Sequence, residues 1–106
     1  MPKFMIQASY TQAGLKGLIA DGGTKRRAAI EKLLGSVGGK LESAYFAFGE
    51  TDVFIVADIP DNVSAAALSM TVNASGAAKC NATILLTPEE VDAATKKSVK
   101  YSAPGQ

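Results

Sequence analysis

Residues 41–58 read LESAYFAFGETDVFIVAD and contain two strand-like runs separated by Gly49–Asp52. The second run, Val53–Ala57, is apolar at every position. Both of its faces are expected to leave water, because successive residues of a strand point to opposite faces. The first run presents Ala44, Phe46 and Phe48 to one face, and Leu41 and Tyr45 to the other. A sheet that is apolar on both sides needs two covers, and a chain of 106 residues readily supplies one. The pattern therefore predicts that the protein associates with itself.

Length and composition favour a single globular domain over residues 1–106. Domains typically contain about 100–150 residues. The chain has 47% hydrophobic and 20% charged residues, a balance typical of soluble globular proteins rather than of disordered chains. Its formal net charge is +1, so no overall field attracts nucleic acid, a membrane surface or an acidic substrate. We expect neither a nucleic acid nor a membrane among its partners.

The residue types that are absent narrow the chemistry. The chain has no His, which excludes a His-based catalytic triad and His-ligated zinc or haem. It has a single Cys, Cys80, so no internal disulfide can form, and a reducing cytoplasm is the expected location. Met1–Lys3 leads directly into a strand, without the apolar segment of a secretory signal. Because the carboxylates are also scattered, we expect the protein to need no metal and no cofactor.

Hydrophobic periodicity predicts the order of the remaining elements. Alternation predicts a strand over 3–10, and apolar spacing predicts a helical turn over 11–19 and helices over 24–37 and 60–76. A strand follows over 79–86 and a short helix from Pro88, and we expect the tail beyond about residue 98 to fray. The order β-α-β-β-α-β predicts an α+β protein with a ferredoxin-like antiparallel sheet and a short additional C-terminal helix. Right-handed crossovers then place both main helices on one face of the sheet.

Three threonines, Thr11, Thr24 and Thr87, mark predicted helix starts, because a Thr hydroxyl can accept an N–H group of the first turn. Thr87–Glu90 reads Thr-Pro-Glu-Glu, the pattern of a capping box with Pro at the first helical position. The helix over 24–37 carries the apolar stripe Ile30, Leu33, Leu34 and Val37, with Lys25, Arg27 and Lys32 mainly off it.

Several short motifs together resemble the GYD family of small proteins. They are Ser9-Tyr10-Thr11, Gly14-Leu15-Lys16, Arg26-Arg27-Ala28, Gly38-Gly39-Lys40, Gly49-Glu50-Thr51-Asp52 and the Thr-Pro-Glu-Glu segment. The resemblance covers roughly residues 3–92, and Thr51 stands where the family usually has Tyr. It implies a ferredoxin-like domain that oligomerises, with a fold similar to that of dimeric α/β-barrel proteins. It implies no particular reaction, because fold alone does not determine function.

Glu50 and Asp52 lie two residues apart in the predicted turn and have two interpretations. As a functional pair they would bind a cation or transfer a proton. As structural residues they would shape the turn, with Gly49 supplying a positive φ and Asp52 accepting N–H groups of the turn. The structural interpretation is favoured, because a divalent cation typically takes about six ligands and no third oxygen-rich segment is present.

Basic residues near the second helix suggest an anion site. Arg26 and Arg27 follow Thr24 at the predicted helix start, where free N–H groups favour an anion, and Lys16 could add a charge. Basic residues in a first turn are also common on solvated surfaces, where they oppose the helix dipole. Tyr10 and Lys16 could form an acid–base pair, although such a Tyr more often packs its ring. Cys80 is predicted to face inward as a small hydrophobe.

A polar row is predicted on the face of the sheet that the helices leave open. It consists of Gln7, Ser9, Asn81 and Thr83. These residues would either form hydrogen bonds across a subunit interface or line a cleft for a small molecule.

Two functions agree with these observations. The first is a non-enzymatic homo-oligomer that binds a small-molecule or anionic ligand, or a partner, in a regulatory or accessory role. The alternative is a cofactor-independent enzyme of the dimeric α/β-barrel kind that acts on a small molecule. No residue is predicted to be catalytic under the first interpretation. The ligand-binding candidates are Tyr10, Lys16, Arg27, Glu50, Asp52 and Asn81.

Overall fold

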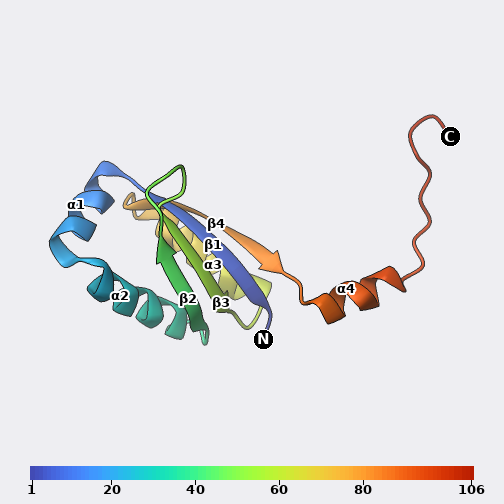
Figure 1. The fold of residues 1–106 in the computed structure, drawn as a ribbon, viewed down its shortest axis with the longest axis horizontal. Helices are drawn as coiled ribbons and strands as arrows, with labels where there is room; N and C mark the ends of the chain where they lie inside the picture. Colours follow the sequence, from blue (N-terminus) through green and yellow to red (C-terminus); the bar gives the residue numbers. More distant parts are fainter.

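The structure, a computed structural model, describes residues 1–106. Its elements are β1 (Lys3–Tyr10), α1 (Gln12–Asp21), α2 (Gly23–Gly35), β2 (Lys40–Phe46), β3 (Val53–Asp58), α3 (Asn62–Ala74), β4 (Ala78–Leu85) and α4 (Pro88–Thr95). The four strands form one sheet in the order β2-β3-β1-β4, and every neighbouring pair is antiparallel (Figure 1). This arrangement confirms the predicted α+β, ferredoxin-like fold.

Local capping explains where three of the helices begin. The Thr11 hydroxyl accepts the Gly14 N–H at 3.2 Å at the start of α1, and the Asp61 carboxylate accepts the Ser64 N–H at 2.7 Å at the start of α3. The latter hydrogen bond lowers the pKa of Asp61 below its ordinary value. Thr87 caps α4 within the predicted capping box, so the predictions for Thr11 and Thr87 are confirmed.

The predicted cap of α2 by Thr24 is wrong. The helix begins at Gly23, and its N-cap is Gly22, which makes no side-chain cap hydrogen bond. Gly22 adopts a φ of 81°, a left-handed conformation that glycine adopts without the steric cost of a side chain. This conformation lets the chain pass from α1 into α2 at a single residue, so Thr24 already lies inside the helix.

The hydrophobic core lies between the sheet and helices α2 and α3. The sheet contributes alternate residues of β1 and β3, and each of the two helices contributes an apolar stripe. The buried residues of this core are Phe4, Ile30, Leu34, Val53, Ile55, Ala57, Ile59, Ala65 and Leu68. One face of the sheet is therefore covered from within the chain.

A β-bulge changes the predicted faces of β2. The pairing with β3 shifts between Leu41 and Ser43, so that Leu41 lies opposite Ala57 and Ser43 opposite Val56. Leu41 consequently packs against the helix-covered core together with Ala44 and Phe46, and its predicted place on the other face is wrong. The extra residue of a bulge reverses the alternation of the strand beyond it, which the simple period of two does not anticipate.

The C-terminal part of the chain projects from the domain. Figure 1 shows α4 and the following segment extending away from the end of β4. No residue of α4 is buried, and residues 96–106 contain no helix or strand. The radius of gyration is 16.8 Å, compared with about 13 Å for a compact domain of this length. We call residues 86–106 the C-terminal arm.

Candidate functional site: the helix-free face of the sheet

The face of the sheet opposite α2 and α3 has no cover within the chain. On β3 it presents Phe54 and Val56, which lie opposite Gln7 and Met5 of the neighbouring strand β1. Tyr45 of β2 lies opposite Phe54 on the same face, and its side chain is 72% exposed. An apolar strip thus runs from β2 across β3 to β1. We refer to this surface as the helix-free face.

The predicted polar row lies beside this strip. Gln7 of β1 pairs with Asn81 of β4, Met5 pairs with Thr83, and Ser9 pairs with Lys79. Residues paired across antiparallel strands share a face, so the structure places Gln7, Ser9, Asn81 and Thr83 on the helix-free face, as predicted. This face is therefore apolar towards β3 and polar towards β4.

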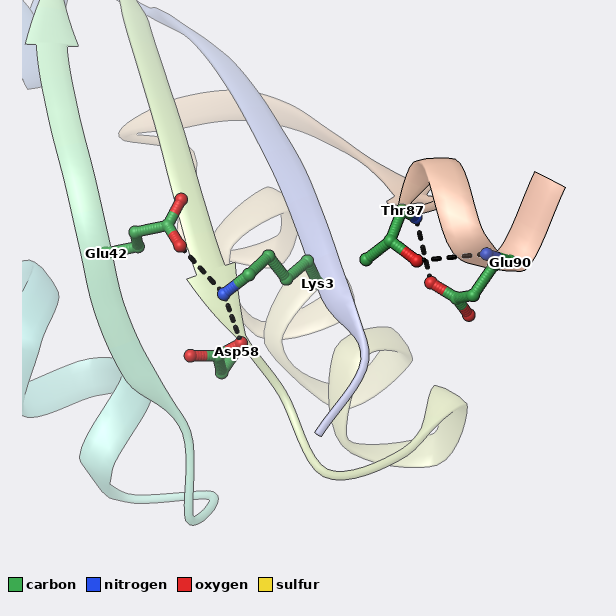
Figure 2. A network of polar contacts seen from close by, with 5 residues as sticks. All are labelled: Lys3, Glu42, Asp58, Thr87 and Glu90. Carbon is green, nitrogen blue, oxygen red and sulfur yellow. Dashed lines mark hydrogen bonds and ion pairs between the residues drawn. The ribbon is translucent and has the colours of Figure 1, made fainter. Parts of the chain in front are cut away.

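An ion-pair cluster occupies one end of the helix-free face. Lys3 Nζ lies 2.7 Å from Glu42 Oε1 and 2.8 Å from Asp58 Oδ1, and Figure 2 shows the amine between the two carboxylates. The hydrogen bond from Lys3 lowers the pKa of Asp58, and the hydrogen bonds to both carboxylates raise the pKa of Lys3. Because Lys3 and Asp58 are paired residues of β1 and β3, the strand register holds the cluster together.

A broad hollow of about 780 Å³ adjoins the ion-pair cluster. Its walls include Val56 and Leu85 of the sheet and Thr87 and Glu90 at the start of the C-terminal arm. Glu90 accepts the Thr87 N–H at 2.9 Å and donates its own N–H to the Thr87 hydroxyl at 3.1 Å (Figure 2). The capping box thus holds the Glu90 carboxylate at the edge of the hollow and links the sheet to the arm.

The loop over residues 47–52 is fastened to the end of β1. The Asp52 carboxylate accepts the Tyr10 N–H at 2.8 Å, and the Asp52 N–H donates to the Ala8 carbonyl at 2.9 Å. The Ser9 hydroxyl donates to the Glu50 carbonyl at 3.0 Å. The Asp52 carboxylate therefore accepts an N–H group from a distant strand, while the Asp52 backbone carbonyl accepts the Ala47 N–H of its own loop at 2.9 Å.

The positive φ predicted for Gly49 occurs elsewhere in this loop. Phe48 is the residue with the left-handed conformation, with a φ of 55°. Its ring stacks on that of Phe46, with the centroids 6.1 Å apart. Phe48 thus lies outside the strand on which it was expected, and its aromatic contact accompanies a backbone conformation uncommon for bulky residues.

The six ligand-binding candidates do not converge on one site. Tyr10 and Asp52 meet through the Tyr10 backbone N–H, while Glu50 contributes its carbonyl to the same loop. Asn81 lies on the helix-free face, and Lys16 is exposed on α1. Arg27 is exposed on α2, where its Nε lies 3.5 Å from Glu31 Oε1. Ligand binding by these residues stays a prediction.

Sequence reasoning named Arg26 with Arg27 in a candidate anion site but did not place it on the apolar stripe of α2. Arg26 precedes Ile30, Leu33 and Leu34 by four, seven and eight positions, so it lies on the apolar stripe of α2. Its side chain is accordingly mostly buried, and its Nε is buried without a hydrogen-bond partner. The sequence signal for its burial was the spacing of Arg26, a basic residue, to the apolar residues of the stripe.

The remaining chemistry-bearing groups are few. Cys80 is buried, and burial raises the pKa of its thiol above the ordinary value. No three His, Cys, Asp or Glu side chains come close enough together to hold a metal ion. None of the four helices has both the length and the apolar character that crossing a membrane requires.

The strand order β2-β3-β1-β4, with α2 and α3 packed on one face, defines the protein as a ferredoxin-like α+β domain. Its sequence matches the family described as GYD domain over residues 4–95, and the chain belongs to this family. No curated protein matches the chain.

Proposed function

We propose that this protein is a homo-oligomer in which two copies cover each other's helix-free faces in a dimeric α/β-barrel-like arrangement. In this form it binds a small ligand in a regulatory or accessory role. We place it in the cytoplasm, where its single cysteine stays reduced. The observation that carries the proposal is the apolar strip on the helix-free face.

The surface area of the single chain supports an assembly. The chain exposes 7329 Å². A folded monomer of 10.9 kDa exposes about 5,600 Å² by the usual scaling of surface with mass. The excess is about twice the ~800 Å² that each partner buries in a standard-size interface. Part of this excess belongs to the C-terminal arm, which extends away from the domain and whose helix α4 has no buried residue (Figure 1).

The occupant that fits the helix-free face best is a second copy of the same chain. A twofold axis would set the apolar strip of one copy against the same strip of the other, which makes the surface complementary to itself. The charged residues at the end of the strip, Lys3, Glu42 and Asp58, are already paired with each other. They therefore require no oppositely charged partner.

The C-terminal arm supports the same assembly. An isolated helix of eight residues is marginal in water, so α4 depends on packing for much of its stability. The arm exposes the apolar side chains of Leu86, Val91, Val99 and Tyr101. A second copy would provide contacts for these side chains that the arm's own domain does not provide.

Two hollows support the binding of a small ligand. The hollow of about 780 Å³ at the helix-free face and another of about 420 Å³ beside α2 both have volumes within the ~300–1,000 Å³ of small-molecule sites. The hollow beside α2 combines mainly apolar walls with two charged side chains, Asp21 and Arg26, which is the usual composition of such sites. The hollow at the helix-free face is more polar, with Lys3, Glu42, Asp58 and Glu90 among its walls.

A matched pair of variants tests the assembly. Val56→Asp places a charge in the middle of the helix-free face, whereas Val63→Asp places the same charge at a position on α3 that is 79% exposed. In sedimentation velocity at micromolar concentration, Val56→Asp is expected to sediment as a single chain. Val63→Asp is expected to sediment like the unmodified protein.

Circular dichroism would accompany the sedimentation runs, because Val56→Asp could also weaken the fold. If Val56→Asp is folded and has the same mass as Val63→Asp and the unmodified chain, the helix-free face is not the interface. Should Val56→Asp unfold, Tyr45→Asp gives the same test at a position that is exposed in the single chain.

A further inference from the structure

An apolar cavity of about 60 Å³ lies on the other side of the sheet, between α2 and α3. Helix α2 packs against α1 and β2, and α3 packs against β4, whereas α2 and α3 make almost no close approach to each other. Twelve of the fourteen residues that line the cavity are hydrophobic. Ile6 and Ile55 contribute from the sheet, and Leu33 and Val72 from the two helices.

A wider hollow lies beside the cavity. This hollow, of about 420 Å³, extends along α1, the start of α2 and the end of α3. It shares Tyr10, Arg26, Leu33, Val72 and Ala78 with the inner cavity. The two spaces are therefore neighbours, with Arg26 and Tyr10 at the place where they meet.

Arg26 brings an unpaired positive charge to this junction. Its Nε is buried and has no hydrogen-bond partner, and Arg26 takes part in none of the four ion pairs of the chain. Arg26 is partly exposed, but the guanidinium stays protonated in proteins, so its buried Nε always carries a hydrogen to donate. Leaving such a group unsatisfied is costly, and an anion would offset that cost.

The other charged group of the outer hollow does not neutralise Arg26. Asp21 lines the hollow, and its carboxylate lies 3.5 Å from Lys25 Nζ. Arg27, one residue away from Arg26, is exposed and paired with Glu31. Arg26 is therefore the cation that faces the apolar cavity and lacks a partner.

We propose that this site binds a small amphipathic monocarboxylate, with its carboxylate on Arg26 and its alkyl chain along the apolar walls of both the outer hollow and the inner cavity. The inner cavity of about 60 Å³ is too small for a whole alkyl chain, because a cavity that binds benzene has about 150 Å³. The outer hollow of about 420 Å³ supplies the remaining space. A guanidinium can hold a carboxylate through two parallel hydrogen bonds, which favours this anion over a neutral head group. The walls around Ile6, Leu33 and Val72 accept an alkyl chain without leaving a polar group unpaired. This inference rests on the ligand-binding part of the proposed function and names the site and the ligand class.

Octanoate is a suitable probe, with octanol and octylammonium as controls of the same chain length. We expect octanoate to raise the melting temperature of the unmodified protein in a concentration-dependent way, because a ligand of the folded state stabilises it. Octanol and octylammonium are expected to bind at least tenfold more weakly. Equal binding of all three probes would contradict recognition of the carboxylate, and no binding of octanoate would overturn the proposal.

Arg26→Met and Arg27→Met form the matched pair of variants. Arg26→Met keeps an unbranched apolar side chain and removes the charge, so it is expected to weaken octanoate binding at least tenfold. It should also melt at a higher temperature than the unmodified protein when no ligand is present, because the buried Nε that lacks a hydrogen-bond partner is gone. Arg27→Met should bind octanoate as the unmodified protein does. Equal affinity in both variants would overturn the role of Arg26.

Cys80 locates the bound molecule. It is the single cysteine of the chain and lines the inner cavity. Octanoate is therefore expected to slow the reaction of Cys80 with a thiol reagent several-fold. An unchanged rate despite octanoate binding would place the molecule elsewhere and overturn this site, while ligand binding as such would stand.

The mass of the assembly, measured on the same samples, separates this inference from the proposed assembly. A single chain that binds octanoate through Arg26 would refute the assembly and support the site. An oligomer to which octanoate does not bind, and in which it does not protect Cys80, would support the assembly and refute the site.

Discussion

Strand β3 is apolar on both faces of the sheet, but the two faces have different covers. On β3, Val53, Ile55 and Ala57 are 1%, 6% and 0% exposed beneath α2 and α3. Phe54 and Val56 alternate with them along the same strand and remain partly exposed on the helix-free face. An apolar residue on a strand thus indicates that its face of the sheet packs against something. The apolar stripes of the helices indicate which of the two faces packs against the chain's own helices.

The largest expected difference between the faces concerns stability. Leu34→Ala removes a buried side chain from the helix-covered core and is expected to cost about 2–5 kcal/mol of the free energy of unfolding. This cost should be the same at every protein concentration, because the core lies within one chain. Tyr45→Ala, on the helix-free face, should instead destabilise the protein more strongly at high concentration, where the proposed assembly would form.

Urea denaturation at two protein concentrations, about a hundredfold apart, measures both effects. If the midpoint of Tyr45→Ala differs from that of the unmodified protein by the same amount at both concentrations, Tyr45 does not lie in an interface. A loss much below 1 kcal/mol for Leu34→Ala would contradict the position of the core.

A smaller effect on stability is expected at the loop over residues 47–52, where Asp52 is hydrogen-bonded to the end of β1. Asp52→Asn keeps an oxygen that can accept the Tyr10 N–H but loses the charge, so it should cost about 1 kcal/mol in urea denaturation. Glu50→Gln is the control, because Glu50 contributes its backbone carbonyl to this contact. Asp52→Asn should also leave octanoate affinity nearly unchanged. A large loss of affinity without loss of stability would make Asp52 a binding residue.

The effect of a substitution in the C-terminal arm on global stability is expected to depend on whether α4 packs against a second copy. Thr87→Ala removes the N-cap of α4 and should cost about 1 kcal/mol. If α4 packs on a second copy as proposed, this cost lowers the midpoint of global unfolding. An unchanged midpoint, with only a small loss of helical circular dichroism, would mean that α4 does not dock.

The smallest effect concerns pH and the ion-pair cluster. The hydrogen bond from Lys3 lowers the pKa of Asp58 in the folded state, so its contribution to stability is present above the ordinary Asp pKa of about 3.9. It is lost as the pH falls through the lowered pKa. Asp58→Asn should remove this part of the acid dependence, measured as melting temperature against pH. An identical pH profile for both proteins would show that the pair contributes nothing.

Much of the fold could be predicted because it is encoded locally. The stripe through Ile30 and Leu34 and the capping box at Thr87 each depend on residues within two helical turns. The family resemblance is confirmed by the match over residues 4–95.

The features that sequence reasoning missed depend on distant parts of the chain. The face of Leu41 is set by a bulge against β3, and the partner of Asp52 is the Tyr10 N–H, 42 positions away. Arg26 differs from these, because its place on the apolar stripe was readable from its spacing to Ile30 and Leu33.

Light scattering of the unmodified protein, over a dilution series at micromolar concentrations, tests directly whether a second copy packs on the helix-free face. The expected mass is about twice the 10.9 kDa of one chain, or a higher multiple, falling towards 10.9 kDa only on strong dilution. A well-folded protein that stays at 10.9 kDa at every concentration would show that the apolar strip across β2, β3 and β1 is exposed to water.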